Sequence, residues 1–322
     1  MYIHKDQEES IAVIIPAFNV EKYIGTVIKH LPTFIDFIIV VDDCSQDTTT
    51  QEIKKIKDQR IHLIRHDKNQ GVGGAMLSGY NLAFELGADI MVKIDGDDQM
   101  DPTYIESLIN PIVELKADYA KGNRFLHIKE LQKMPVVRRI GNLGLSFLTK
   151  LSSGYWNIFD PTNGYTAIHK EVYKLLDKAA IDKDYFFETS MLMQLNKIKA
   201  LVLDIPIPAK YDNQLSNISL MSTLFKFPWK LLRGLFKRIG YQYFLFDFTA
   251  TSVYLLMGVP ALLFGITWGI IQWVHSIKTG IIATSGTVLI AVLPIIIGIQ
   301  LIIQAISLDI NDVPKTSIRI ND

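Results

Sequence analysis

Residues 91–101 read MVKIDGDDQMD, an apolar run that ends abruptly in a cluster of acidic side chains. Asp95 and Asp97 are separated by a single glycine, and the Asp-Pro pair at 101–102 is typical of the start of a helix. We therefore expect the acids where a buried strand ends and the next helix begins. In open α/β sheets, ligands bind at this edge.

The acid pair predicts a metal site. Two carboxylates this close repel each other unless a cation lies between them. A hard divalent cation such as Mg²⁺ or Mn²⁺ is the usual partner, and it often shares its coordination shell with substrate phosphates. The alternative is a solvated acidic turn, because Asp-Gly-Asp is also common in turns.

Continuous apolar runs alternate with helical patterns over the first hundred residues. Continuous rather than alternating apolarity is typical of strands that are covered on both faces, as in a parallel sheet. The order of the elements predicts a doubly wound α/β domain. The apolar runs are 11–15, 37–41, 61–64 and 90–94, and the helical patterns are 20–30, 47–57 and 72–86.

A glycine-rich loop, QGVGGA at residues 70–75, opens the third helical pattern. Its spacing is not G-x-G-x-x-G, and it follows the third apolar run rather than the first, which argues against a nicotinamide cofactor. The glycines are instead expected to let the helix pack closely against the sheet and to let the backbone approach a ligand.

The composition limits the classes of function. The chain has 322 residues, in which 33 basic and 33 acidic side chains balance, so no overall charge favours nucleic acid. The single cysteine, Cys44, excludes an intramolecular disulfide and fits a reducing compartment. The polar first ten residues lack the pattern of a signal peptide.

The C-terminal part of the chain is apolar. Between Phe248 and Leu308 the only formally charged side chain is Lys278. The stretches 248–274 and 281–307 are each long enough to cross a hydrocarbon core about 30 Å thick as a helix. They predict a transmembrane hairpin in a lipid bilayer, and pairing of two hairpins could make a homo-oligomer. The alternative is a helical hairpin buried in a soluble core.

Four motifs within residues 11–125 carry a family resemblance. They are VIIPAFN at 13–19 followed by Glu21, VVDDCSQDT at 40–48, NQGVG at 69–73 and DGD at 95–97. Each is weak alone, but their order and separations resemble those of family 2 glycosyltransferases with the GT-A fold. The resemblance implies an α/β domain with a Rossmann-like, mostly parallel sheet and helices on both faces.

The resemblance also implies a donor site for a UDP- or GDP-sugar with Mg²⁺ or Mn²⁺. A sugar-nucleotide diphosphate is a poor leaving group until its developing charge is neutralised, which a bound cation does. The expected metal ligands are Asp95, Asp97 and Gln99, and Asp97 is also counted as catalytic. The expected donor-binding residues are Pro16, Ala17, Asn19, Glu21, Asp42, Asp95 and Gly96.

Basic residues further along suggest an acceptor site. Residues 118–125 read as another strand that runs into a basic turn. In the dolichyl-phosphate mannose synthase group, arginines at such positions contact phosphate; Arg124 matches the first of them, and either Arg138 or Arg139 the second. A guanidinium fork suits phosphate geometry. The alternative is that these are solvated loop arginines.

Two further acids stand in segments that resemble family segments, Asp160 in FDPTNGYTA at 159–167 and Glu188 in DYFFETSML at 184–192. The resemblance implies that Asp160 is a catalytic carboxylate near the reacting carbon, unless it only caps a turn. It implies that Glu188 is a catalytic base, although the acid that usually follows is absent. A phosphate acceptor needs no base because it is already ionised, whereas a hydroxyl acceptor does.

Residues 219–240 form an amphipathic helical pattern in which aromatic and aliphatic residues lie between basic ones. This predicts a helix in the headgroup plane, bent at Pro228, and its cations place this side of the membrane in the cytoplasm. A calmodulin-target or nucleic-acid helix has the same pattern, but the adjoining apolar hairpin argues against both. The basic residues are Lys226, Lys230, Arg233, Lys237 and Arg238.

The predicted organisation is a GT-A domain over 1–215, interfacial amphipathic helices over 216–246, a transmembrane hairpin over 247–309 and a polar tail over 310–322. The predicted function is a membrane-anchored, metal-dependent inverting glycosyltransferase. It would move a sugar from a nucleotide sugar to undecaprenyl or dolichyl phosphate on the cytoplasmic face. An alternative acceptor is a hydroxyl of a lipid-linked saccharide or glycolipid. A non-enzymatic alternative is a degenerate membrane scaffold that binds nucleotide sugar without turnover.

Overall fold

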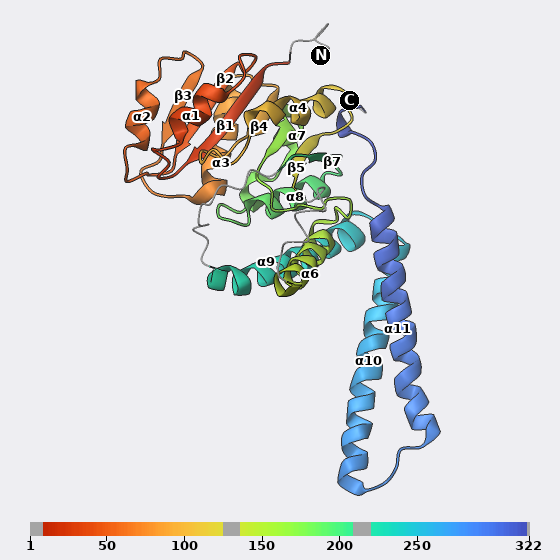
Figure 1. The fold of residues 1–322 in the computed structure, drawn as a ribbon. Helices are drawn as coiled ribbons and strands as arrows, with labels where there is room; N and C mark the ends of the chain where they lie inside the picture. The colour runs from red at the N-terminus through yellow and green to blue at the C-terminus, as the bar shows by residue number, and fades with distance from the viewer. Residues whose placement is uncertain (1–8, 125–135, 209–219, 321–322) are drawn as a thin grey trace. The chain divides into compact units, whose positions relative to one another are not determined.

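The computed structural model describes residues 9–124, 136–208 and 220–320, and the side chains of residues 136–143 and 220–226 lie outside the described part. The chain divides into two compact units. The first comprises Met1–Leu235 and Pro314–Asp322, and the second comprises Phe236–Val313. Figure 1 shows the helices and strands of both.

Seven strands form one sheet in the first unit: β1 (Ile11–Ala17), β2 (Phe37–Asp42), β3 (Ile61–Arg65), β4 (Ile90–Lys93), β5 (Tyr119–Asn123), β6 (Thr166–His169) and β7 (Val202–Pro206). Their order across the sheet is β3-β2-β1-β4-β6-β5-β7. All neighbours are parallel except for the two pairs made by β6, which are antiparallel. The predicted mostly parallel sheet is therefore confirmed.

Helices cover both faces of this sheet, as predicted. Apart from α9 (Leu220–Gly240), the helices of the first unit are α1 (Ile24–His30), α2 (Thr49–Lys55), α3 (Gly71–Glu85), α4 (Ile105–Val113), α6 (Val136–Ser153), α7 (Lys170–Leu175) and α8 (Phe187–Lys197), with the 3₁₀ turns η1 (Pro102–Tyr104), η2 (Lys178–Ala180) and η4 (Ile318–Ile320). The apolar residues of α1, α2 and α4 join one core cluster on one face. On the opposite face α3 packs so tightly that a Cβ at Gly79 would overlap the Ile14 side chain.

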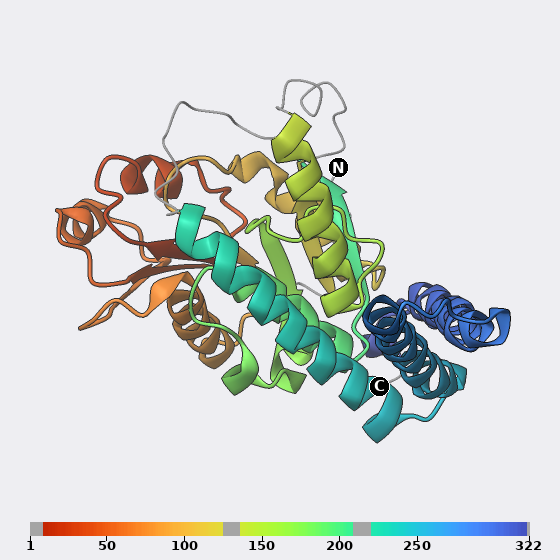
Figure 2. The same cartoon turned by 90° about the horizontal axis from the view of Figure 1, so that it is seen from below.

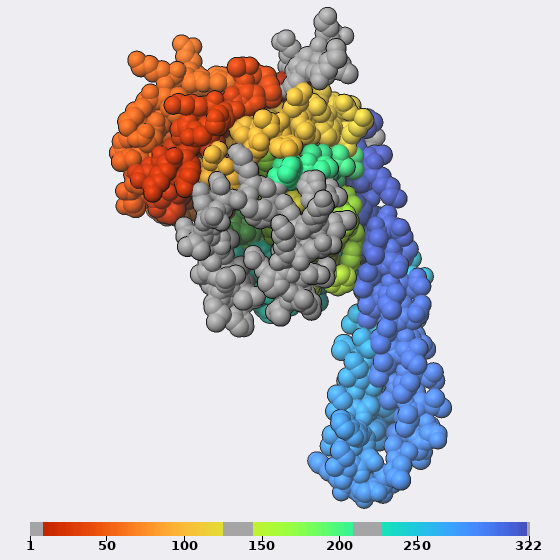
Figure 3. All heavy atoms as spheres, viewed as in Figure 1, coloured from red at the N-terminus to blue at the C-terminus, as the bar shows by residue number. Residues whose placement is uncertain are grey.

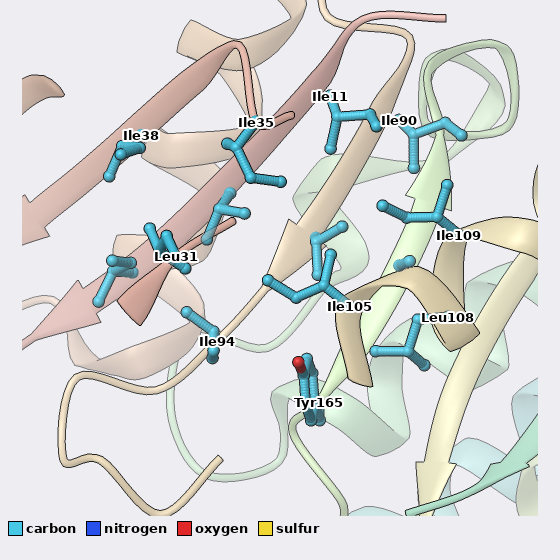
Figure 4. Close-up of a cluster of buried hydrophobic side chains, with 14 of the residues drawn as sticks. Ile11, Leu31, Ile35, Ile38, Ile90, Ile94, Ile105, Leu108, Ile109 and Tyr165 are labelled. Atoms are coloured by element: carbon cyan, nitrogen blue, oxygen red, sulfur yellow. The ribbon is translucent and has the colours of Figure 1, made fainter. Parts of the chain in front are cut away.

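The apolar runs predicted as strands supply the core. Every residue of β4 is buried, and β1 is buried except at Pro16. Figure 4 shows side chains of the sheet and of α4 meeting in one cluster, with the Tyr165 ring near Leu108 and Ile105. Cover on both faces explains why these runs are continuously apolar.

The acidic segment after β4 ends in the expected helix start. Asp101 Oδ1 accepts hydrogen bonds from the Thr103 N–H at 3.0 Å and from the Thr103 hydroxyl at 2.8 Å. Pro102 is the first residue of η1, which leads into α4. Asp101 therefore acts as the cap of the helical segment.

The second unit is a helical hairpin. The end of α9 (Leu220–Gly240) and the π-helical turn η3 (Tyr241–Phe246) precede α10 (Ala250–Thr279) and α11 (Ser285–Asn311), which lie side by side (Figures 1 and 3). Both long helices are apolar enough to cross a membrane, and only 11% of the most apolar 18-residue window of each is buried. This exposure contradicts the alternative of a hairpin buried in a soluble core.

Glycines let the two long helices approach each other closely. A Cβ at Gly265 would lie 2.6 Å from the Ala291 carbonyl oxygen, and one at Gly298 would lie 2.7 Å from the Leu262 nitrogen. Small residues at such contacts are typical of membrane helices, which associate through packing because lipid tails are as apolar as the side chains. The hairpin therefore has the packing expected of two membrane helices.

Arg238, counted among the cations of the amphipathic helix, does not lie at its surface. It is buried in the second unit, where Nη1 and Nη2 contact the two carboxylate oxygens of Asp309 at 2.7 and 2.9 Å. The Tyr243 hydroxyl donates to the same carboxylate. A two-pronged pair of this kind holds a buried guanidinium, and its acidic partner lies 71 residues away in the chain, outside any local pattern.

The segment predicted as a polar tail packs on the first unit from Pro314 onward. Asp118, fully buried before β5, accepts hydrogen bonds from the Ser317 hydroxyl at 2.5 Å, the Ile318 N–H at 3.0 Å and the Leu201 N–H at 2.7 Å. Arg319 Nε lies 3.5 Å from the same carboxylate. A buried charge is stable only when it is paired, so Asp118 accounts for the position of these C-terminal residues.

We expect deletion of residues 314–322 to destabilise the first unit. The buried Asp118 would keep the Leu201 N–H but lose its other partners, a cost of about 3 kcal/mol, or roughly 6–12 °C in Tm for a domain of this size. Thermal denaturation of the full chain in detergent measures the change. Ser317→Ala should lower the Tm by part of this amount. Thr316→Ala, at an exposed neighbouring position, should leave the Tm unchanged. An unchanged Tm after the deletion would contradict the role of the segment.

Candidate active site

The parallel strands β1, β2 and β4 end at one edge of the sheet, and the predicted donor and metal residues follow them. The chain leaves β1 toward β2 on one side and returns to β4 on the other, the kind of switch point at which α/β proteins bind ligands. Asn19, Cys44 and Asp98, in the three loops at this edge, have φ angles of 54°, 66° and 64°. Left-handed backbone at non-glycine residues is strained and often lies at functional sites.

Asn19 and Glu21, both predicted to bind the donor, hold two of these loops together. Asn19 donates its N–H to the Ser45 hydroxyl at 3.0 Å, and its side-chain oxygen accepts from the Gln46 N–H at 2.8 Å. Glu21 accepts from the Thr48 N–H at 2.9 Å and from the Thr48 hydroxyl at 2.6 Å. These hydrogen bonds lower the pKa of Glu21. Pro16 and Ala17 lie at the end of β1 beside these loops.

Asp42, predicted to meet the base or ribose, is fully buried at the end of β2. Its carboxylate accepts hydrogen bonds from the Ser45 N–H at 2.8 Å and from the Thr50 hydroxyl. The structure thus shows Asp42 as a support for the loop after β2, and contact with a donor stays a prediction. The neighbouring Asp43 has a similar role, because it accepts from the Gly71 N–H at 2.8 Å.

The glycine-rich loop approaches another loop rather than open space. A Cβ at Gly71 or Gly73 would overlap the backbone of residues 182–184, which precede α8. The close approach to the sheet predicted for this segment occurs instead at Gly79, about two turns into α3. The glycines therefore let the loop after β3 pack closely against the segment that carries Glu188.

Asp95 and Asp97 lie together in the loop after β4, and they fit a divalent cation. Burial and the charge of Asp95 both raise the pKa of Asp97, so a cation bound beside the two carboxylates would favour their ionised forms. Within the described residues no group of three or more His, Cys, Asp or Glu side chains could hold a metal. Two carboxylates are nevertheless typical of Mg²⁺ sites completed by water and substrate phosphates. Gln99 is exposed next to the pair and donates its N–H to Asp97 Oδ1 at 3.1 Å.

Lys93 is a candidate site residue that the motifs in the sequence did not single out. Its ammonium lies 2.9 Å from Asp95 Oδ1 and 3.1 Å from Glu188 Oε1, and its side chain is 2% exposed. Burial alone would lower the pKa of Lys93, but the two carboxylates outweigh it and raise the pKa. The sequence does contain a signal for this residue, because Lys93 is a lysine inside an otherwise apolar run. A lysine is almost never fully buried unless it is paired, so this position indicates a buried ion pair.

Gly164 covers this charged group. A Cβ there would overlap Lys93 Nζ and would lie 3.2 Å from Asp95 Oδ2 and 3.3 Å from Glu188 Oε1. Asn163 precedes it, and its carbonyl accepts a hydrogen bond from a second buried lysine, Lys121. The segment around Asp160 therefore closes over the charges below it.

Lys121 is fully buried on β5. Burial lowers its pKa to about 8, although the nearby charges of Glu188 and Asp160 oppose this shift. No motif singled out Lys121, which lies within the segment predicted as a strand at 118–125. Together with Lys93, it supplies positive charge beneath the loops that carry the predicted catalytic acids.

Arg124 and Asp160, predicted separately, form one ion pair. Arg124 Nε lies 2.7 Å from Asp160 Oδ2, and Nη2 lies 3.1 Å from Oδ1. The carboxylate of Asp160 is fully buried, whereas the Arg124 side chain is 40% exposed. Asp160 therefore orients the guanidinium rather than serving only as a turn cap. Arg138 and Arg139 lie in α6, but their side chains are outside the described residues, and their roles stay predictions.

Asp204 on β7 is a further acid near this ion pair. Burial raises its pKa to about 6, although its Oδ2 accepts hydrogen bonds from the Phe159 N–H and the Asn123 side chain, each at 2.8 Å. Its Oδ1 is buried without a hydrogen-bond partner within the described residues. Nothing in the local sequence around residue 204 distinguished this acid from a surface residue of an edge strand.

Comparison with known proteins agrees with this geometry. Residues 12–176, half of the chain, match glycosyl transferase family 2. The chain is 36% identical over 219 residues to the UDP-N-acetylglucosamine–dolichyl-phosphate N-acetylglucosaminyltransferase of Methanococcus voltae, covering 63% of this chain and 87% of that protein. It is 25% identical over 202 residues to the undecaprenyl-phosphate mannosyltransferase of Micrococcus luteus, covering 61% of this chain and 82% of that protein.

A solved structure shares the fold. The glucosyl-3-phosphoglycerate synthase of Mycobacterium tuberculosis, solved with Mg²⁺ and UDP, aligns with a TM-score of 0.54 and 18% identity, covering 72% of this chain and 80% of that one. At this identity the likeness concerns the fold alone. It confirms the GT-A architecture expected from the sequence.

Proposed function

Because this chain belongs to glycosyl transferase family 2, we propose that it transfers a sugar from a UDP- or GDP-sugar to a polyprenyl phosphate at the edge formed by β1, β2 and β4. The chain is a glycosyltransferase by family, and the two relatives above carry dolichyl phosphate and undecaprenyl phosphate in their names. The proposal concerns the acceptor, the metal and the residues that bind them.

The observation that carries the proposal is the pairing and burial of the acidic side chains around the site. Asp160 is buried against Arg124, and Glu188 is paired with Lys93. Asp204 Oδ1, which has no hydrogen-bond partner among the residues that the structure describes, is buried. A hydroxyl acceptor needs a carboxylate that can take up its proton, whereas a phosphate monoester is already ionised. The arrangement therefore favours a phosphate acceptor over a sugar hydroxyl.

In the proposed reaction an oxygen of the acceptor phosphate attacks the anomeric carbon. The new C–O bond forms on the side opposite the bond to the nucleoside diphosphate. The bond to the nucleoside diphosphate breaks, this group leaves, and the configuration at the anomeric carbon inverts. Asp95, Asp97 and Gln99 would hold Mg²⁺ or Mn²⁺, which would neutralise the charge of the leaving diphosphate. Arg124, oriented by Asp160, would bind the acceptor phosphate.

The test is a transfer assay with purified protein, radiolabelled UDP- and GDP-sugars, Mn²⁺ and either undecaprenyl or dolichyl phosphate. We expect an organic-extractable lipid that releases the sugar in mild acid, as a monophosphoryl glycolipid does. Label only in longer lipid-linked saccharides would replace the phosphate acceptor by a hydroxyl. Donor binding without transfer or hydrolysis would favour the non-enzymatic scaffold.

We also propose that α9 and the hairpin hold the enzyme at the cytoplasmic face of a membrane. In the first unit α9 lies beside α6, where the Ser152 hydroxyl donates to the Leu231 carbonyl at 2.9 Å (Figure 2). Lys230, whose side chain is 40% exposed, pairs with Asp182 at 2.6 Å. The exposed residues of α9 combine apolar bulk with positive charge, as interfacial helices do: Trp229, Leu232, Arg233, Phe236 and Lys237.

We expect Trp229→Ala to weaken the use of a lipid acceptor in vesicles. The side chain is 71% exposed, and its burial in a membrane interface would contribute about 1.5–3 kcal/mol. We expect kcat/KM for undecaprenyl phosphate in vesicles to fall about tenfold, and kcat/KM for a short, water-soluble isoprenyl phosphate to stay unchanged. Phe84→Ala, at an exposed position on α3, is the control. Equal losses with both acceptors would contradict an interfacial role.

A further inference from the structure

A buried lysine joins the donor side of the site to α8. Lys93 comes from β4, Asp95 from the loop after it, and Glu188 from the start of α8, 95 residues later than Lys93. One ammonium contacts both carboxylates, at 2.9 and 3.1 Å. Two acids from distant parts of the chain are therefore held by a single cation.

The packing around this group leaves it little freedom. Gly164 lies directly over the three charged groups, so that even a methyl group there would overlap the ammonium. A side chain that is enclosed at the density of a protein interior changes rotamer only if its neighbours move. The orientation of Lys93 is thus set by the fold rather than by the ion pairs alone.

The two acids differ in exposure. The Asp95 side chain is 33% exposed, whereas the Glu188 side chain is 12% exposed and Lys93 only 2%. Asp95 therefore has one oxygen fixed by a buried cation while part of its side chain reaches the surface. A group that must bind a ligand in one orientation benefits from such support, because its rotamer freedom is lost before binding.

We propose that Lys93 is a positioning residue for the donor, which holds Asp95 in the orientation that binds a nucleoside diphosphate and links it to Glu188. The inference rests on the proposed function, since it takes Asp95 as a donor ligand. Lys93 itself is too deeply buried to touch the donor. A purely structural ion pair would affect the stability of the fold, whereas a positioning residue also affects nucleotide affinity in a variant whose stability has been restored.

The test compares Lys93→Met, Glu188→Gln and the double variant in the full chain. Lys93→Met leaves two acids without their cation, so its Tm should fall; the double variant removes one of the stranded charges and should recover most of that Tm. Calorimetric titration with UDP and with GDP, each with Mn²⁺, should show about tenfold weaker binding in both variants that lack Lys93. Glu188→Gln alone, which keeps the Lys93–Asp95 contact, should bind nucleotide within about twofold of the parent protein.

Turnover separates the possible outcomes. In the double variant we expect kcat to stay about a hundredfold low despite the recovered Tm, because a misaligned donor reacts slowly. A double variant with both Tm and nucleotide affinity restored would overturn the positioning role and leave a structural ion pair. A loss of about a thousandfold in Glu188→Gln with unchanged nucleotide affinity would instead identify Glu188 as a base, which would overturn the phosphate acceptor but not the role of Lys93.

Discussion

Replacement of Asp97 by asparagine is expected to lower sugar transfer about a thousandfold while leaving the fold as stable as before, or more so. The loss follows from the proposed metal site, because an amide is a weaker ligand for Mg²⁺ or Mn²⁺ and carries no charge to hold it. A thousandfold loss corresponds to about 4 kcal/mol of transition-state stabilisation. This is within the range that electrostatic groups aimed at a developing charge provide.

The expected effect on stability has the opposite direction. Burial and the charge of Asp95 raise the pKa of Asp97, so in the metal-free protein its ionised form is less favourable in the folded chain than in the unfolded chain. The parent protein should therefore lose stability as the pH rises through the ordinary carboxyl range to the raised pKa of Asp97, and the asparagine variant should not. Thermal denaturation without metal at pH 4 and pH 7 measures this difference.

A control variant lies within the same acidic segment. Asparagine caps helices as well as aspartate does, so Asp101→Asn should keep both its hydrogen bonds to Thr103 and the transfer activity. The measurement is the rate of transfer at saturating donor together with a Mn²⁺ titration of each variant. Transfer by Asp97→Asn at more than about a tenth of the parent rate would remove Asp97 from the metal site.

Replacement of Gly164 by alanine should damage both stability and catalysis. The added methyl group would overlap the ammonium of Lys93 and crowd Asp95 and Glu188, in a place where Lys93 has no exposed direction in which to move. Overpacking of a core costs about 1–3 kcal/mol, and a displaced ammonium would also leave a carboxylate unpaired. We expect kcat to fall about a hundredfold, since a misplacement of about 1 Å has effects of this size.

A second glycine provides the matched control. Gly25 lies in α1, where an added Cβ would meet nothing within 4 Å. Gly25→Ala should therefore leave transfer unchanged and stabilise the helix by up to about 1 kcal/mol. Denaturation curves and transfer rates of the two variants test the pair. If Gly164→Ala were as active and as stable as Gly25→Ala, Gly164 would not confine the charged group beneath it.

Much of the fold followed from local patterns in the chain. The four continuous apolar runs form β1 to β4, and the two apolar stretches form α10 and α11. Both could be predicted because the burial of a strand on both faces and the length of a helix are visible in consecutive residues. The insertion of β6 between β4 and β5 had no such signal. This strand has four residues, Thr166–His169, and its antiparallel pairing depends on segments far away in the chain.

The candidate site divides in the same way. The acid pair after β4, Arg124, Asp160 and Glu188 could all be picked out as candidate site residues from their own motifs. The partners of these groups could not, because Lys93 and Glu188 are 95 residues apart, Arg124 and Asp160 are 36 apart, and Asp118 and Ser317 are 199 apart. A buried charge is stabilised by whichever opposite charge the order of strands brings against it, and no window of consecutive residues contains that order.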